Sequence, residues 1–405
     1  MSSWPSSPRK AAVAFILFTV FLDVVAMGII IPVFPSLITR FLNGDMPRAA
    51  EIYGLFGTIW ALMQFLCSPA VGALSDRFGR RPVVLLSNLG LGLDYVLMAL
   101  APDLTWLFVG RVIAGITAAS ISAAGAYIAD VTPPEKRAGS FGLIGVAFGL
   151  GFVMGPALGG VLGGIDLHLP FWVAAGLSLA NAAYGFFVLP ESLPRERRRV
   201  FSWARANPVG ALVLLRSHPQ LSGLAVVHFL YTLAHNVLPS VFVLYTAYRY
   251  GWDERTIGLT MGGFGIAIIV VQGVIVKPAV ARFGERATLM LGLISAVLGL
   301  SIYGLAPTGY VLWMGVPIAA LWGAYGPASQ GLMTRRVSPS EQGQLQGALS
   351  SILGITGMIG PALFTLTFAR AISVPHPAWP GAPFLLAAAL VAVALGLAWR
   401  VTRSA

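Results

Sequence analysis

The stretch GALSDRFGRRPV, residues 72–83, decides the fold because it differs so sharply from the chain around it. Its charged residues, Asp76, Arg77, Arg80 and Arg81, crowd into six consecutive positions. Of the 405 residues, 57% are hydrophobic and only 10% are charged, with a mean hydropathy of +0.81. A soluble domain has about a quarter of its residues charged and about half apolar. Lipid must cover the apolar excess, so the sequence predicts an all-α polytopic membrane protein in which this stretch joins two spans.

Twelve apolar runs are long enough to cross a membrane, which takes about 20 residues. The predicted spans are 11–38, 50–72, 82–101, 104–128, 139–164, 170–189, 220–246, 256–279, 287–306, 309–332, 345–369 and 382–400. With a cytoplasmic N-terminus, 20 of the 26 Lys and Arg residues lie inside and five outside, and Arg111 lies within a span. This asymmetry predicts that both termini are cytoplasmic. The basic residues recur as short clusters between spans, so we expect no nucleic-acid partner.

An internal repeat divides the chain into halves. Arg77-Phe78-Gly79 recurs as Arg282-Phe283-Gly284, and Gly155-Pro156 recurs as Gly360-Pro361, each after 205 residues. Six spans return the chain to its starting side, so the two copies have the same orientation. Parallel repeats of this kind are a transporter architecture. The predicted organisation is an N-terminal six-helix bundle over 1–190, a cytoplasmic linker over 191–219 and a C-terminal six-helix bundle over 220–405.

Away from the span ends, three charged residues lie at mid-bilayer, Asp23, Asp94 and Arg111, all in the N-terminal half. A charge at mid-bilayer costs about 2.5–3.5 kcal/mol on insertion scales, which makes each one a functional hypothesis. A carboxylate that moves between wet and sealed surroundings near a cation can load and release a proton. We therefore predict that Asp23 and Asp94 carry protons and that Arg111 takes part. The alternative is a permanent Asp–Arg pair that only holds helices together.

Neutral polar side chains also occur within the spans. The candidate substrate contacts are Gln64, Asn88, His228, Asn236 and Gln272. Three further polar residues within the spans are Asn181, His235 and Gln330. For each, the alternative is a hydrogen bond to a neighbouring helix. His228 follows Asp23 by 205 residues, the repeat offset.

The run GLGFVMGPALGG at 149–160 has the small residues of a helix-packing surface. Gly151, Gly155 and Gly159 form one stripe that allows close approach of another helix. Pro156 removes a backbone donor and favours a kink. The run predicts a packing or hinge element. No phosphate-binding loop or metal-ligand spacing occurs in the chain, so we expect no cofactor and no enzyme activity.

These motifs together resemble the major facilitator superfamily, and within it the twelve-span drug/proton antiporters. The matching strings are GALSDRFGRRPV, GRVIAGITAA (110–119), GFVMGPALGG (151–160) and LDVVAMGIIIPVFPSL (22–37). More narrowly, the chain resembles the tetracycline/proton antiporters of Gram-negative bacteria, in these strings and in ALMQF, LDYVLMAL, YGW (250–252) and QGQLQGAL (342–349).

The resemblance implies a proton-coupled antibiotic exporter of the bacterial inner membrane that works by alternating access, as a monomer. It implies proton-coupling roles for Asp23, Asp94 and Arg111. It also implies a cytoplasmic gate, formed by Gly72, Asp76, Arg77, Gly79 and Arg80. The substrate can arrive as a divalent-metal complex. That family has a histidine in the eighth span and an aspartate in the ninth, where this chain has Ile268 and Ala296.

Three alternatives stay open at this stage. The first is a proton-coupled exporter of another amphipathic drug, such as a phenicol or a quinolone. The second is a metabolite facilitator without proton coupling, against which the intramembrane acids Asp23 and Asp94 argue. The third, a polytopic membrane enzyme, lacks a histidine cluster and a nucleophile with a base at motif spacing.

Overall fold

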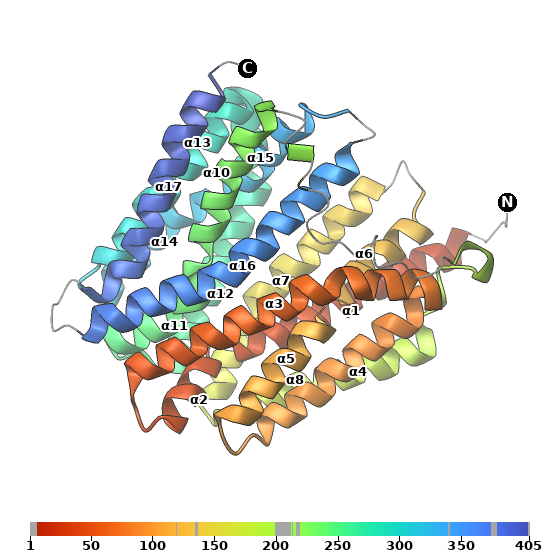
Figure 1. Ribbon diagram of the computed structural model, residues 1–405, viewed down its shortest axis with the longest axis horizontal. Helices are drawn as coiled ribbons and strands as arrows, with labels where there is room; N and C mark the ends of the chain where they lie inside the picture. The colour runs from red at the N-terminus through yellow and green to blue at the C-terminus, as the bar shows by residue number, and fades with distance from the viewer. Residues whose placement is uncertain are drawn as a thin grey trace. The chain divides into compact units, whose positions relative to one another are not determined.

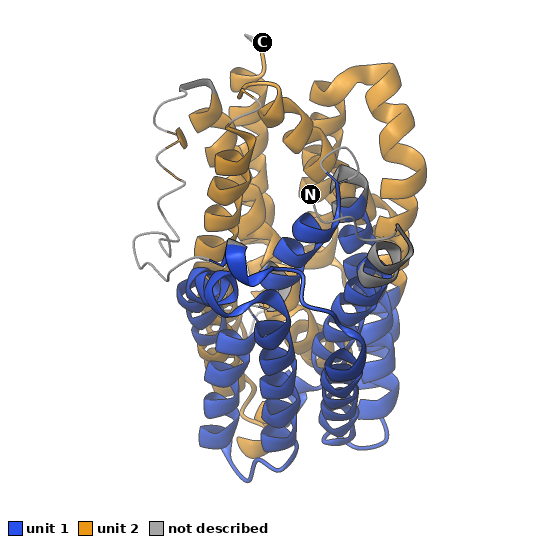
Figure 2. Cartoon of the chain, turned by 90° about the vertical axis from the view of Figure 1, so that its right-hand side faces the viewer, with its two compact units in different colours: residues 1–37, 59–207, 254–262 blue, residues 38–58, 208–253, 263–405 orange. Residues whose placement is uncertain are grey.

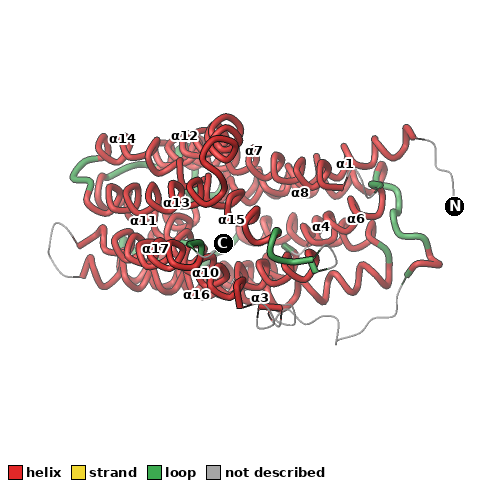
Figure 3. The backbone as a smooth tube through the Cα atoms, turned by 90° about the horizontal axis from the view of Figure 1, so that it is seen from above, coloured by secondary structure: helices red, strands yellow, loops and turns green. Residues whose placement is uncertain are grey.

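A computed structural model describes residues 6–118, 120–133, 137–198, 212, 214–215, 219–338, 341–373 and 379–403. Every regular element in these ranges is helical (Figures 1 and 3). The α-helices of the first half are α1 (Ser6–Ile30), α2 (Phe34–Phe41), α3 (Met46–Phe78), α4 (Arg80–Ala99), α5 (Leu104–Thr117), α6 (Ser120–Val131), α7 (Arg137–Gly163) and α8 (Leu169–Val188). A short 3-10 turn, η2 (Arg195–Arg197), follows.

The second half contains both α-helices and tighter or wider turns. Its elements are α10 (Pro219–His235), α11 (Val237–Tyr250), α12 (Glu254–Val270), the π-helix η4 (Val271–Ile275), α13 (Val276–Leu305), α14 (Gly309–Ala320), the 3-10 helix η5 (Leu321–Ala324), α15 (Tyr325–Thr334), α16 (Gln342–Ser373), the 3-10 turn η6 (Trp379–Gly381) and α17 (Ala382–Val401).

All twelve predicted spans fall on helices of the described ranges. Ten helical stretches are long and apolar enough to cross a membrane. One of them, Glu254–Leu305, has 52 residues, about 78 Å of helix and more than twice the hydrocarbon thickness. It reverses at Gly284, whose φ of 79° and ψ of 167° interrupt the helix. The remaining span, predicted over 104–128, consists of α5 and α6 in succession.

Prolines explain the breaks in the first and the seventh predicted spans. The first span divides between α1 and α2 at residues 31–33, where Pro32 and Pro35 cannot donate to the preceding turn. The seventh span divides at Asn236, between α10 and α11. Pro239 removes the backbone donor that would have bonded the carbonyl of His235.

The chain forms two compact units, coloured separately in Figure 2. Unit 1 comprises residues 1–37, 59–207 and 254–262, and unit 2 comprises 38–58, 208–253 and 263–405. In unit 1, α1 packs against α7 and α8, and α4 packs against α5, α6 and α8. In unit 2, α17 packs against α10 and α13, and α16 packs against α10 and α11. The six-helix bundles and the linker over 191–219 stay a prediction, since much of 199–218 lies outside the described residues.

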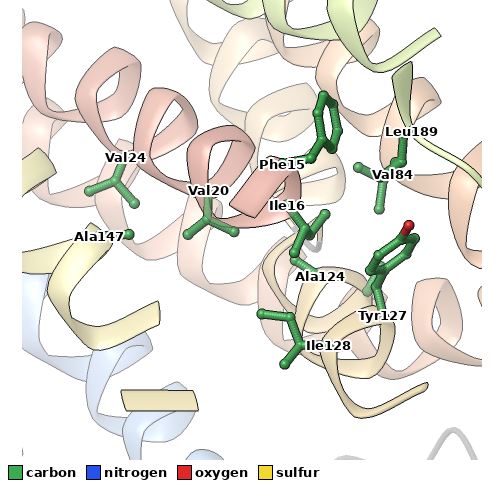
Figure 4. Close-up of a cluster of buried hydrophobic side chains, with 11 residues drawn as sticks. Phe15, Ile16, Val20, Val24, Val84, Ala124, Tyr127, Ile128, Ala147 and Leu189 are labelled. Atoms are coloured by element: carbon green, nitrogen blue, oxygen red, sulfur yellow. The ribbon is translucent and has the colours of Figure 1, made fainter. Parts of the chain in front are cut away.

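The core of unit 1 contains a cluster where α1, α4, α6 and α7 meet (Figure 4). Phe15, Ile16 and Val20 of α1 pack there with Tyr127 and Ile128 of α6. The hydroxyl of Tyr127 donates to the carbonyl of Pro190, 3.1 Å away, so the one polar atom of this cluster is bonded. The cluster fixes α1 and α6, the helices that flank the polar groups described next.

Candidate functional site

The carboxylate of Asp23 lies in the interior of unit 1. Asp23 is on α1 and 8% exposed, and its Oδ1 accepts a hydrogen bond of 3.0 Å from Nδ2 of Asn181 on α8. The same amide nitrogen donates to the carbonyl of Thr19, 3.1 Å away. Asn181 is fully buried. Its amide therefore holds the Asp23 carboxylate in one orientation against α8.

Asp94, on α4, is more deeply buried than Asp23. It is 1% exposed, and neither carboxylate oxygen has a hydrogen-bond partner among the described residues. A methyl group built on Gly110 of α5 would lie 2.9 Å from Oδ1 of Asp94. The guanidinium of the next residue, Arg111, donates to Sδ of Met98 at 3.0 Å and lies 4.7 Å from the ring centre of Phe34. The predicted acid and cation thus lie beside one another without a direct hydrogen bond.

Tyr95 connects the predicted ionisable groups. Its side chain is 2% exposed, and its hydroxyl is close enough to interact electrostatically with Asp94, Asp23 and Arg111. All of these residues belong to unit 1. Asn88, one turn and a half before Asp94 on α4, is also buried, and its Oδ1 has no partner in the described part of the chain. Unit 1 therefore encloses buried polar groups on α1, α4 and α8, which include Asp23, Asp94 and Asn181.

The motif at 72–83 forms a charge cluster around Arg80 at the start of α4. Arg80 is paired through Nη2 with Asp76 at 2.6 Å and through Nε with Asp130 at 3.1 Å, and Nη1 donates to Oγ of Ser75 at 2.5 Å. The backbone N–H of Arg80 donates to Oε1 of Glu191 at 2.8 Å. The loop arginine is therefore held by three elements, α3, α6 and the segment that follows α8.

The other gate candidates lie around this cluster. Gly79 has φ 109° and ψ 158°, and a side chain there would strike the carboxylate of Glu191, so only glycine fits. A methyl group on Gly72 would meet nothing within 4 Å. Arg77 is exposed, with its guanidinium 5.0 Å from the ring centre of Phe78. Within unit 1, Arg80 rather than Arg77 organises the motif.

The predicted glycine stripe on α7 faces α1. A methyl group on Gly155 would lie 2.6 Å from the Cα of Gly28, and one on Gly151 would lie 2.7 Å from Cγ1 of Val24. One on Gly159 would overlap the backbone of Ile29. Pro156 lies within α7, which continues through it to Gly163. The stripe brings two backbones into contact, as small residues do between membrane helices.

The substrate-contact candidates are divided between the units. Gln64 is half-buried on α3 in unit 1, together with the buried Asn88. In unit 2, Nδ1 of His228 lies 3.4 Å from the hydroxyl of Tyr325. Nδ2 of Asn236 donates to the carbonyl of Thr232 at 2.8 Å. Gln272 is exposed within the π-helix η4.

The residues at the two departures from the family pattern are apolar and lie in unit 2. Ala296 is fully buried on α13, and Ile268 is half-buried on α12. No group of three or more His, Cys, Asp or Glu side chains able to hold a metal occurs among the described residues.

Sequence reasoning missed the partners of Arg80, which are Asp130 and Glu191. Asn181 was among the polar residues named within spans, and it forms the hydrogen bond to a neighbouring helix that was its alternative role, here to Asp23. Asp130 offered a signal, because an acid at the predicted cytoplasmic end of a span does nothing for the positive-inside bias. Glu191 offered none, since it lies in a polar stretch rich in charge.

Long apolar helices with ionisable groups inside the spans, in a chain that repeats after 205 residues, fit a membrane transporter. The chain belongs to the Major Facilitator Superfamily, whose model matches residues 16–253 and 224–405. The chain is 40% identical over 391 residues to the tetracycline resistance protein, class C, of Escherichia coli, covering 95% of each chain. It is 35% identical over 381 residues to the class E protein of Escherichia coli, covering 94% of this chain and 92% of the relative.

A solved structure supports the fold. A bacterial homologue of the human lysosomal transporter Spinster, inward-facing and occupied, has a TM-score of 0.79 and 17% identity, covering 99% of this chain and 98% of that chain. The predicted membership of the superfamily and the predicted resemblance to tetracycline antiporters are confirmed. The chain is therefore a transporter rather than an enzyme.

Proposed function

We propose that this protein is a proton-coupled exporter of tetracycline-type antibiotics that works by alternating access. The 40% identity to the class C tetracycline resistance protein supports the substrate class. The observation that carries the coupling is the buried carboxylate of Asp94, which has no hydrogen-bond donor in the described part of the chain and interacts electrostatically with Arg111. Burial favours the neutral acid and the guanidinium favours the anion. A small relative movement of the two then loads or releases a proton.

Asp23 is the second proton carrier in this proposal. Its carboxylate accepts a hydrogen bond from Asn181. It also interacts electrostatically with Tyr95, as Asp94 does. A proton moving inward across 100 mV supplies about 2.3 kcal/mol. One unit of pH gradient adds about 1.4 kcal/mol. One proton per neutral drug molecule can therefore sustain an outward accumulation of several hundred-fold.

The cluster of Asp76, Arg80 and Asp130 is the proposed cytoplasmic gate. Its ion pairs of 2.6 and 3.1 Å tie the start of α4 to α3 and α6, so this end of α4 can move only as those pairs break. We place both termini in the cytoplasm and the protein in the bacterial inner membrane, as a monomer. The cycle needs no cofactor, although the drug can arrive as a divalent-metal complex.

A sensitive bacterial strain provides the first test. Expression of the chain should raise the inhibitory concentration of tetracycline, and Asp23→Asn and Asp94→Asn should remove the effect while protein levels stay normal. Everted vesicles should accumulate tetracycline only when a pH gradient is imposed. Asp103→Asn is the matched control, because Asp103 caps α5 through its side chain and asparagine caps equally well. Equal uptake with and without the gradient would contradict proton coupling and indicate an uncoupled facilitator.

A second substrate class, phenicols and quinolones, is favoured by one observation. Ile268 is half-buried and Ala296 is fully buried, so these positions offer no charged group to a cationic metal complex, and an uncharged drug such as a phenicol needs none. The same susceptibility panel separates the classes, since resistance to a phenicol without resistance to tetracycline would replace the first proposal by the second.

A further inference from the structure

Three segments of unit 2 depart from regular α-helix inside membrane spans. The seventh span is broken at Asn236, the π-helix η4 interrupts the eighth, and the 3-10 helix η5 interrupts the tenth. η4 packs against η5. His235, the last residue of α10, lies 4.8 Å from Trp322 of η5, measured between ring centres. Irregular backbone at membrane depth is tolerated only inside protein or beside a water-filled cavity.

The break at Asn236 has a counterpart in the first half of the chain. Subtracting the repeat offset of 205 from 236 gives 31, and α1 ends at Ile30 before the break at 31–33. Interrupted helices at corresponding positions of two repeats are a pointer to the binding site of a transporter. The helix break at position 236 is therefore expected from the repeat as well as from the nearby Pro239.

The side chains around the break in unit 2 form an aromatic wall. Tyr231 stacks on Tyr325 at 3.6 Å between ring centres and lies 6.2 Å from the ring of His235. Phe264 of α12 meets Trp322 edge-on at 5.6 Å. Trp322 is only 2% exposed, so it packs against these side chains and is not itself open to a ligand.

His235 is the polar group that this wall presents. Its side chain is exposed, and its ring contacts are with Tyr231 and Trp322, with no hydrogen bond to the ring among the described residues. His228, by comparison, is half-buried and within hydrogen-bonding distance of Tyr325. Gln272 of η4 is likewise exposed, and its side chain lies close to Gly323, the residue after Trp322. An imidazole without a hydrogen-bond partner inside an apolar span is energetically unfavourable, which makes a functional role for His235 the default hypothesis.

We propose that His235, with Tyr231, Phe264 and Gln272, forms a recognition site for a planar aromatic ring that carries oxygen substituents along one edge. The ring packs on Tyr231 and Phe264, and the oxygens bond to His235 and Gln272. Trp322 is a positioning residue that orients the imidazole of His235. The proposal rests on the proposed function, because it assigns a place to the drug that the exporter carries.

Equilibrium binding of tetracycline to the full-length protein in lipid nanodiscs tests the site. His235→Ala should weaken binding about 3- to 10-fold, the range of one hydrogen bond. His235→Gln, which keeps a donor, should recover part of the loss. Trp322→Leu should weaken binding similarly, and the double variant His235→Ala/Trp322→Leu should be no weaker than either single variant, since Trp322 acts through His235. His168→Ala and Trp172→Leu, in unit 1, are the matched controls.

The outcomes separate the site from the function. Additive losses in the double variant would show that Trp322 does not act through His235. If the wild-type protein binds tetracycline and His235→Ala binds it equally well, the site is wrong and the exporter stands. If the wild-type protein neither binds tetracycline nor confers resistance to it, both proposals fall. Size-exclusion profiles that match wild type exclude unfolding as the cause of any loss.

Discussion

The carboxylate of Glu285 lies 3.0 Å from the guanidinium of Arg335, and this ion pair is the reversed-charge counterpart of the pair between Arg80 and Asp130. Adding the repeat offset of 205 to 80 gives 285, and adding it to 130 gives 335. The repeat therefore conserves the contact between two elements while exchanging the acid and the base. Position 76 has no such counterpart, because the equivalent residue is Ala281.

The reversed pairs should respond differently to a charge exchange. Glu285→Arg alone places two cations together, and adding Arg335→Glu should restore the contact and the thermal denaturation midpoint. The gain is about 1 kcal/mol at most, because the Arg335 side chain is 75% exposed and solvent screens the pair. Arg80→Asp with Asp130→Arg should not recover, since the new acid faces Asp76.

Both exchanges are measured by melting of the detergent-solubilised protein. Recovery in unit 1 equal to that in unit 2 would mean that Asp76 contributes nothing to the cluster.

Gly110 should tolerate no side chain, because a methyl group there would lie 2.7 Å from Cγ of Met98 and 2.9 Å from Oδ1 of Asp94. Gly110→Ala must push α4 away from α5, at about 1–3 kcal/mol for overpacking. Gly176→Ala on α8 meets nothing within 4 Å and should be neutral or stabilising by up to about 1 kcal/mol. Melting midpoints of the two variants check this. Equal melting midpoints for the two variants would contradict the close contact between Asp94 and α5.

The two buried asparagines of unit 1 should differ in what they contribute to stability. Asn181→Leu removes the donor to Asp23 and to Thr19 and should destabilise by about 1–3 kcal/mol. Asn88→Leu replaces a side chain whose Oδ1 is already unpaired in the described structure, so it should be close to neutral. Denaturation monitored by circular dichroism measures both. A larger loss for Asn88→Leu would reverse the assignment.

The turn glycines of the two repeats should also differ. Gly79 and Gly284 both have positive φ, 109° and 79°, with extended ψ, a region in which other residues cost about 1–3 kcal/mol. Gly284→Ala should lose only this amount, since nothing lies within 4 Å of the new methyl group. Gly79→Ala should lose more, because it also displaces Glu191 from the backbone of Arg80. Gly343→Ala, with an open surrounding and ordinary φ, is the control, and melting midpoints rank the three.

Much of the fold could be predicted from composition and periodicity. Apolar runs gave all twelve spans because the bilayer imposes one length on every element. The 205-residue offset found at Arg77 and Gly155 holds in three dimensions, as the matching φ values of Gly79 and Gly284 show. What periodicity missed were the breaks at 31–33 and at Asn236. A proline in an apolar run can bend, break or leave a helix intact, as Pro156 does in α7.

The polar interior of unit 1 was predicted in part. Asp23, Asp94 and Arg111 were singled out because hydrocarbon penalises charge wherever it occurs in a span. Asn181 was named among the polar residues within spans, but its pairing with Asp23 could not be found in this way. The contact from Asn181 to Asp23 joins residues 158 positions apart, and only the packing of α8 on α1 creates it.

The seam between α1 and α7, where Gly28 meets Gly155, can be harmed only by adding atoms. Any replacement there separates the two helices, and among apolar replacements the effect grows with side-chain volume. Asp94 shows the opposite dependence in our proposal, because glutamine or asparagine of similar volume should fail while another acid retains some function. A saturation scan would therefore separate positions of this transporter at which side-chain volume limits function from positions at which side-chain charge does. It requires no knowledge of the drug.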